Sequence, residues 1–438
     1  MNRFLFSFIS LFTFVYISSQ EQGLKLTPNQ FEALFLKQNL ELIAVQMNID
    51  IAEATITQAK LWDNPELSIS SINLWSTEKQ RQGQNELIPP LFGSFGKNTQ
   101  FTVELSQLIQ TANKRAKLVH KEKVAKDMAG VEFEELLRSL KAELRKSIYE
   151  AYYLQSYVTI LNIQSESLEQ LVTTYRKQVN EGNIAKSELL RLQSSLMEIE
   201  NEKNESMMAI NEYQKTLKSL INAEPLVNIE FVIDENQSRL IAPNDISLST
   251  LLNKSIDFRP DIQHQQLTTQ YYEKSLAYEK SLRVPDLTIN ASYDRFGGVW
   301  KDFVGFGFSI NLPFFNRNQG NIKTARFLSQ QSRLQEEKQQ KLAQNEIIKA
   351  YNDYQQAYTF FRKINDDNFL SELDLMLDVY AKNLLNKNIS MLEFIDFMDS
   401  FRNKKQIVLA SEKNANILFD ELQYVAATEL KSIDLKTE

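Results

Sequence analysis

The chain has 438 residues, contains no cysteine and carries a formal net charge of −7 at neutral pH. The lack of cysteine excludes disulfide cross-links and the lipid-bearing cysteine of a lipoprotein, and the acidic charge argues against nucleic-acid binding, which needs a basic surface. No residue spacing typical of a catalytic nucleophile, a phosphate-binding loop or a metal site is found, so we predict no enzymatic activity, no cofactor and no bound metal.

Residues 1–20 have the pattern of a secretory signal peptide. Arg3 supplies a positive charge, residues 4–17 form an uncharged apolar run, and small or polar residues follow it. An uncleaved membrane anchor is the alternative, but the run is short for a helix that has to span about 20 residues of bilayer. No later apolar segment reaches about 18 residues, so we predict an exported protein without transmembrane helices.

The rest of the chain contains the same unit twice. The segment that begins at Tyr175 recurs at Tyr380, 205 residues later, and the motif that begins at Pro65 recurs at Pro285, 220 residues later. Such repetition is typical of one structural unit used twice. We expect a first repeat over residues 21–225, a linker over 226–247, a second repeat over 248–431 and a tail over 432–438.

Each repeat is predicted to begin with a helix and to end with a long helical hairpin, over residues 111–222 and 317–430. Neither hairpin contains a proline, the strongest helix breaker. Apolar residues recur every 3.5 positions for five heptads from Leu189 and again from Phe394. This period is typical of left-handed coiled-coil packing.

The first helical hairpin is predicted to turn near Gly182 and the second over residues 386–388. Glycine and asparagine tolerate the left-handed backbone that ends many helices. The second turn carries Lys387 where a glycine is common. We therefore expect Asn386 or Asn388 to adopt the left-handed conformation there.

Between the helices the hydrophobic pattern changes to alternation, which predicts strand hairpins over about 66–109 and 286–313. The apolar phase slips between Ile69 and Ile72, so we expect a bulge or register break in the first strand. Aromatic residues lie at the strand ends and are predicted to form a belt at a lipid–water interface, although aromatics of an ordinary sandwich core are the alternative. The predicted membrane-interface residues are Trp75, Phe296, Trp300 and Phe303.

Four strands cannot close a barrel, and an open sheet edge is not tolerated in lipid. Closure therefore has to come from several copies of the chain. Two copies give eight strands around an interior filled by side chains, whereas three copies give twelve strands with room for a passage. The amphipathic helices also need partners to bury their apolar seams, and a ring of them would continue the barrel as a tube.

The sequence resembles the TolC family of outer-membrane efflux proteins from about residue 26 to residue 430. The residues that carry the resemblance are the segments 26–33, Arg259-Pro260-Asp261-Ile262, Pro285-Asp286-Leu287 and Leu312-Pro313-Phe314-Phe315, together with the paired helix turns. The resemblance implies a mainly α-helical fold with a transmembrane β-barrel, internally duplicated. It implies a homotrimer with a twelve-stranded barrel in the lipid of the bacterial outer membrane and a helical barrel in the periplasm. A periplasmic adaptor and an inner-membrane pump of the RND type are the implied partners.

The resemblance also implies roles for residues around the helix turns. Glu393 and Asp396 match acidic residues that ring the periplasmic aperture and help to hold it closed. Glu393 also matches the partner of Ser390 in a capping box, and this structural role alone is the alternative for it. The predicted adaptor-contact residues are Gly182, Asn183, Ile184, Asn388, Ile389 and Ser390.

The predicted function is a passive exit duct of a tripartite efflux system. Residues 388–396 resemble the branch associated with cobalt, zinc and cadmium or copper export, which makes heavy-metal cations the favoured substrate. Drug efflux and type I protein secretion through the same fold stay open. The alternative class is an exported structural coiled-coil protein, which explains the heptads and the signal peptide but not the alternating strands.

Overall fold

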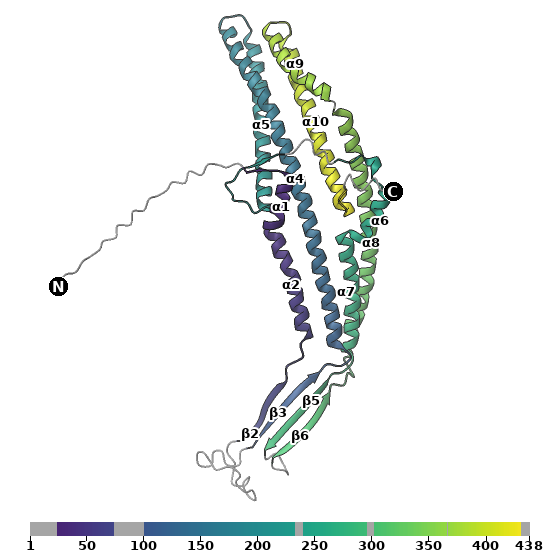
Figure 1. Cartoon of the computed structure of the whole chain (residues 1–438). Helices are drawn as coiled ribbons and strands as arrows, with labels where there is room; N and C mark the ends of the chain where they lie inside the picture. Colours follow the sequence, from purple (N-terminus) through teal and green to yellow (C-terminus); the bar gives the residue numbers. More distant parts are fainter. Residues whose placement is uncertain (1–23, 74–99, 233–239, 296–301, 366, 431–438) are drawn as a thin grey trace, which may run out of the picture.

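The computed structural model describes residues 24–73, 100–232, 240–295, 302–365 and 367–430. Long helices form one elongated body, and a four-stranded sheet extends from one end of it (Figure 1). The helix turns lie at the opposite end (Figure 1). Among the described residues, no helix combines the length and the apolar character that crossing a membrane requires. The predicted signal peptide (1–20) and tail (432–438) lie outside the described residues.

The two repeats contain the same elements in the same order. The first repeat contains α1 (Pro28–Gln38), α2 (Leu40–Lys60), β2 (Glu66–Asn73), β3 (Gln100–Ile109), α4 (Lys114–Asn180) and α5 (Lys186–Leu220). The second contains α6 (Leu248–Phe258), α7 (Pro260–Leu282), β5 (Leu287–Arg295), β6 (Phe303–Ile310), α8 (Gln319–Ile364), α9 (Asp367–Leu385) and α10 (Met391–Ala426). Next to the sheet, α2, α4, α7 and α8 contact one another in that order, and α4 continues past them to pack on α5 and α10 (Figure 1).

The long helix of the first repeat is continuous, whereas its counterpart in the second repeat is interrupted. α4 has 67 residues without a break, which corresponds to about 100 Å at the helical rise of 1.5 Å per residue. In the second repeat α8 ends at Ile364, and α9 begins at Asp367. The sequence at this point reads Asn-Asp-Asp-Asn over residues 365–368. Asparagine and aspartate have a low helix propensity, so this sequence disfavours the continuous helix that was expected here.

The strands form one antiparallel sheet in the order β2-β3-β5-β6, so that the strand hairpins of the two repeats pair directly. The predicted irregularity in the first strand is confirmed. The register of β2 against β3 shifts between Ser70 and Asn73, and Ser71 has a φ of 55°. β2 and β6 remain as the two edges of the sheet.

Asp286, in the Pro-Asp-Leu motif, contacts residues at the start of α4 and so connects the sheet to the helices. Its Oδ1 accepts a hydrogen bond of 2.8 Å from the backbone N–H of Thr111 and lies 2.7 Å from Nζ of Lys114. The Lys114 side chain is buried, so this ion pair is shielded from water on one side. These two contacts hold the start of β5 against the start of α4, at the junction between the sheet and the helices.

The predicted linker over residues 226–247 contains regular structure. Its strand β4 (Ile229–Phe231) pairs in parallel with β1 (Leu24–Leu26) from the beginning of the chain, and a short 3-10 helix spans Pro243–Asp245. Lys25 and Glu230 form an ion pair of 3.0 Å across this ribbon. These segments surround the middle of the helical body (Figure 1).

Three clusters of buried apolar side chains stabilise the helical body. One lies at the turn end between α4, α5, α9 and α10, with Leu192 and Phe394 fully buried in it. The other two lie near the middle of the body, one in each repeat. The heptad seams predicted from the sequence supply much of these clusters, because Ile199 and Leu217 in α5 and Phe401 in α10 are also buried.

Candidate functional site: the sheet faces and the helix turns

One face of the four-stranded sheet is apolar across all four strands. Residues directly opposite each other in an antiparallel register point to the same side, so the face can be read from the pairing. The row Leu67, Leu105, Ala291 and Phe306 and the row Ile69, Val103, Tyr293 and Val304 lie on this face, as do Ile289 and Phe308. Phe306 is 84% exposed and Phe308 is 75% exposed, so the described residues of the chain leave this part of the face uncovered.

The opposite face of the sheet is polar. It carries Ser68, Thr102, Glu104, Ser106, Asn290, Ser292, Asp294, Gly305 and Gly307. Asn290 Nδ2 donates a hydrogen bond of 2.9 Å to Glu104 across β5 and β3. Gly307 lies directly opposite Asn290, and a Cβ at Gly307 would come within 2.5 Å of Asn290 Oδ1. The glycine therefore makes room for the amide on this face.

The predicted aromatic belt falls largely on residues that the structure does not describe. Trp75, Phe296 and Trp300 lie outside the described residues. Phe303 begins β6, directly opposite Asp294, and thus points to the polar face rather than to the face of Phe306. The role of Phe303 at a membrane interface stays a prediction, and its placement does not favour it.

The two helix turns have the same backbone geometry, and Gly182 corresponds to Lys387. Gly182 has a φ of 78° and Lys387 a φ of 60°. In each turn this residue donates to a carbonyl three residues before it, and the next residue, Asn183 or Asn388, donates to a carbonyl five residues before it. This is a Schellman motif in both turns. The expectation that Asn386 or Asn388 would be left-handed is therefore wrong: Lys387 adopts that conformation, because both hydrogen bonds fix its position in the motif.

A capping box begins the helix that follows the second turn, as predicted. The Ser390 side chain accepts from the backbone N–H of Glu393, and Glu393 Oε2 accepts from the backbone N–H of Ser390 at 2.7 Å. The backbone and hydroxyl hydrogen bonds from Ser390 hold the pKa of the Glu393 carboxyl below its ordinary value. Glu393 therefore carries a negative charge at the tip of the molecule over a wide range of pH.

Asp396 lies on the exposed side of α10, three residues after Glu393. The next residue, Phe397, stacks on Tyr380 of α9, with ring centroids 3.9 Å apart. At the equivalent places of the first repeat stand Glu188 and Arg191, so only the second repeat has two carboxylates there. Asp396 is exposed among the described residues, which leaves it available to a neighbouring copy or to solvent.

Ile184 and Ile389 pack against the apolar cluster below the turns, whereas Gly182 and Asn388 belong to the exposed tips. Ala185 begins α5 without a side-chain cap, while Ser390 caps the equivalent helix. Within the described ranges, no group of three or more histidine, aspartate or glutamate side chains is arranged to hold a metal ion. Two features escaped the sequence analysis: the helix interruption after Ile364, signalled by its Asn-Asp-Asp-Asn run, and a cationic cavity at the start of α4.

Comparisons with known proteins agree with this architecture. The family described as "Outer membrane efflux protein" matches residues 33–223. The cobalt-zinc-cadmium resistance protein CzcC of Cupriavidus metallidurans is 21% identical over 66% of this chain. That alignment spans 63% of CzcC, which is less than two-thirds of the relative's length.

Two solved structures have the same fold over almost the whole chain. The CmeC outer membrane channel of Campylobacter jejuni superposes with a TM-score of 0.75 at 15% identity, covering 93% of this chain and 86% of CmeC. CusC superposes with a TM-score of 0.71 at 15% identity, covering 92% of each chain. At such low identity these similarities establish the fold, and the details of the site have to come from the residues of this chain.

Proposed function

Because the chain belongs to the outer membrane efflux protein family, we propose that it forms the outer-membrane exit channel of a tripartite efflux system. The observation that carries this proposal is the sheet, with an apolar face on one side, on which Phe306 and Phe308 are exposed, and a polar face on the other. An apolar surface that crosses every strand is stable only against an apolar solvent or a partner, and lipid supplies the first. The polar face then lines the passage.

Three copies would complete the passage. In one chain β2 and β6 are open edges, and their unpaired N–H and C=O groups would each cost several kcal/mol in lipid. Pairing β2 of one copy with β6 of the next removes these edges and gives a twelve-stranded barrel. The helices continue the barrel wall into the periplasm, and the turns form its far end. The protein then resides in the outer membrane as a homotrimer.

The turn end would meet the partners. We assign the exposed tip residues around Gly182 and Asn388 to contact with a periplasmic adaptor, and Glu393 and Asp396 to the aperture. Three copies would place six carboxylates around one constriction, an arrangement that favours cations. We assign the supply of energy to an inner-membrane pump of the RND type.

Heavy-metal cations are the favoured substrate. The alignment with a protein named for cobalt, zinc and cadmium resistance supports this choice, as does the carboxylate pair at the turn. Drug efflux and type I protein secretion are the competing uses of the same channel. An exported structural coiled-coil protein would have no reason to expose Phe306 and Phe308 on a sheet.

The closure of the sheet can be tested by disulfide cross-linking, because the chain has no cysteine of its own. Ser68 in β2 and Ser309 in β6 lie near the helix-proximal ends of the two edge strands. The double variant Ser68→Cys with Ser309→Cys is expected to give covalent trimers and no larger products in outer-membrane fractions, because a closed ring of three copies leaves no free edge for a fourth. Ser106→Cys with Ser309→Cys is the control, since β3 is paired on both sides.

Covalent trimers from the edge pair and none from the control support the barrel. Oxidised protein that stays monomeric at every position along the β2 and β6 edges, including Ser70 with Gly305, contradicts it. The substrate is tested by deleting the gene and measuring growth on zinc, cobalt, cadmium, copper, dyes and detergents. Sensitivity confined to the dyes and detergents would exclude the metal proposal and leave the channel proposal intact.

A further inference from the structure

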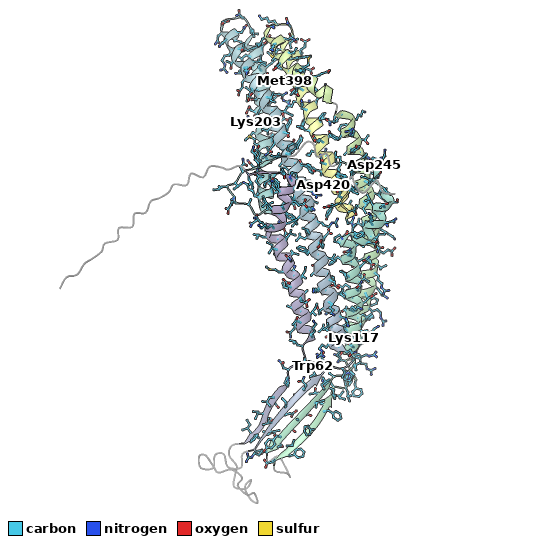
Figure 2. The ribbon with its side chains drawn as sticks, in the orientation of Figure 1. Trp62, Lys117, Lys203, Asp245, Met398 and Asp420 are labelled. Atoms are coloured by element: carbon cyan, nitrogen blue, oxygen red, sulfur yellow. The ribbon has the colours of Figure 1, made fainter. Side chains whose placement is uncertain are left out.

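A cavity of about 540 Å³ lies where the first repeat passes from helices to sheet. It is bounded by the end of α2, the segment that leads to β2 and the first turns of α4. Figure 2 shows Trp62 and Lys117 at this junction, between the helical body and the sheet. In the proposed orientation the cavity lies at the periplasmic edge of the bilayer.

The walls of the cavity are cationic and partly apolar. Lys60, Arg115 and Lys123 line it, and Asp63 is the only acidic residue in the lining, which leaves a net formal charge of +2. The carboxylate of Asp63 already accepts a hydrogen bond of 2.9 Å from Gln110. In a chain with a net charge of −7, a cavity with this charge is unusual.

Arg115 is the least exposed of the three cations in the cavity lining. Its guanidinium carbon lies 3.7 Å from the centroid of the Trp62 ring, a cation–π contact that fixes the side chain. Its Nη1 is buried and has no hydrogen-bond partner among the described residues. A buried guanidinium N–H without an acceptor is costly, so this atom needs an anionic or polar ligand.

The start of α4 adds to the positive potential. Asn113 precedes the helix with a φ of 54° and provides no side-chain cap, and the first turn contains no acidic residue. Free backbone N–H groups and the helix dipole make such a helix start positive, and cations placed there raise its energy. An anion in the cavity would offset the positive potential of the helix start and the charge of the nearby cations.

The fold itself does not require these cations. The start of α8 has the same geometry as the start of α4, with Asn318 at a φ of 56° before the helix and no side-chain cap. The residues of the second repeat that correspond to Arg115 and Lys123 are Gly320 and Leu328. Arg115 and Lys123 are therefore specific to the first repeat, whereas Lys60 has a counterpart in Lys280.

We propose that this cavity binds the phosphate-bearing headgroup of an anionic phospholipid in the bilayer leaflet next to the helices. The proposal rests on the proposed function, because only a sheet embedded in the outer membrane brings the cavity to that leaflet. Lys60, Arg115 and Lys123 contact the phosphate, and the indole of Trp62 occupies the depth at which tryptophan favours the membrane interface. The bound lipid anchors the first repeat at a fixed height in the membrane.

The test uses the full-length protein reconstituted with phosphatidylglycerol and phosphatidylcholine, then extracted in mild detergent. Lipid that stays bound is counted per chain by mass spectrometry, with inorganic phosphate added in a parallel arm. The wild type is expected to retain phosphatidylglycerol selectively. In Lys60→Gln with Lys123→Gln that selectivity is expected to fall about 25-fold, because each cation near an anionic lipid surface contributes roughly a five-fold factor.

Both lysines are exposed, so the double lysine variant is expected to keep the fold. Arg115 is less exposed, so Arg115→Gln is made as a second, separate variant, and its selectivity for phosphatidylglycerol is also expected to fall. Lys254→Gln with Lys338→Gln removes two exposed cations elsewhere and is expected to change nothing. Equal retention of the two lipids by the wild type overturns the inference, as does displacement of phosphatidylglycerol by millimolar phosphate, which would identify a free-phosphate site. The same preparations are tested for trimers: trimers without lipid selectivity overturn only this inference, whereas monomers overturn the proposed function with it.

Discussion

Asn39 and Arg259 occupy equivalent positions in the two repeats, and each ties a helix junction to the end of the last helix of its repeat. Asn39 Nδ2 donates a hydrogen bond of 2.8 Å to the carbonyl of Leu220, and Arg259 Nη1 donates one of 2.9 Å to the carbonyl of Val425. The two carbonyls are themselves equivalent, 205 residues apart. The repeats thus preserve a contact while changing the chemistry of the donor from an amide to a guanidinium.

We predict that Arg259→Ala lowers the stability of the folded chain by about 2–3 kcal/mol, because it removes a buried guanidinium that bonds to Asp261, Glu346 and the carbonyl of Val425. Arg259 Nη2 lies 2.6 Å from Asp261 and 2.7 Å from Glu346, and the Arg259 side chain is only 8% exposed. Thermal unfolding of the detergent-solubilised protein measures the effect. Arg333→Ala is the matched control: its pair with Glu273 is exposed on both sides, so its loss should cost less than about 1 kcal/mol.

The ion pair between Arg259 and Asp261 also predicts a loss of stability in acid. Burial raises the pKa of the Asp261 carboxyl, but the hydrogen bond and charge of Arg259 outweigh it and hold the pKa below its ordinary value of 3.8. A carboxyl with a lowered folded pKa stabilises the fold above 3.8, and this contribution disappears as the pH falls through the folded pKa. The stability difference between wild type and Asp261→Asn should therefore shrink below pH 3.8. A difference that stays constant from pH 6 to pH 3 would contradict the assignment.

The turns allow a test of backbone strain. Gly182→Ala should lower stability by about 1 kcal/mol, because a Cβ is disfavoured at a φ of 78° while nothing lies within 4 Å to stabilise it. Lys387→Gly at the equivalent position should have the opposite sign or no cost, since the glycine relieves strain. Unfolding of the two variants under identical conditions checks the prediction. A stabilising Gly182→Ala would show that the first turn is not left-handed.

The two faces of the sheet should differ in their tolerance of charge. Phe306→Arg is expected to cost about 2–4 kcal/mol in the membrane-embedded state, because it places a cation on the lipid-facing side. Ser68→Arg lies on the polar face directly opposite Glu104 and should be tolerated. The yield of folded trimer in outer-membrane fractions measures both. Equal yields from the two variants would contradict the assignment of the faces.

The repeat architecture could be predicted from the sequence because it rests on periodicity. The bulge in β2, the capping box at Ser390 and the helical hairpins follow from local patterns. The left-handed Lys387 could not be predicted, because the two hydrogen bonds of the motif select the position and outweigh the residue's own preference. The face of Phe303, in contrast, follows from the sequence, because it lies three residues before Phe306 and side chains alternate along a strand.

The cationic cavity was missed for a different reason. Lys60, Asp63 and Arg115 are brought together only when β2 and β3 pair and place the end of α2 beside the start of α4. Charges on a long helix are common and, taken singly, indicate a solvated surface. These charges indicate a binding site only because a cavity lies between the end of α2 and the start of α4, and a local sequence pattern does not reveal such a cavity.

The measurement that tests the central claim most directly is ion conductance of the purified protein in a planar lipid bilayer. We expect discrete, cation-selective conductance steps from the wild type, because three copies of Glu393 and Asp396 would surround the aperture. Asp396→Ala should conduct more and select cations less, whereas Glu198→Gln, an exposed carboxylate elsewhere on α5, should behave like the wild type. Wild-type-like conductance of Asp396→Ala would remove the aperture assignment, and folded protein that produces no conductance steps in either form would contradict the channel itself.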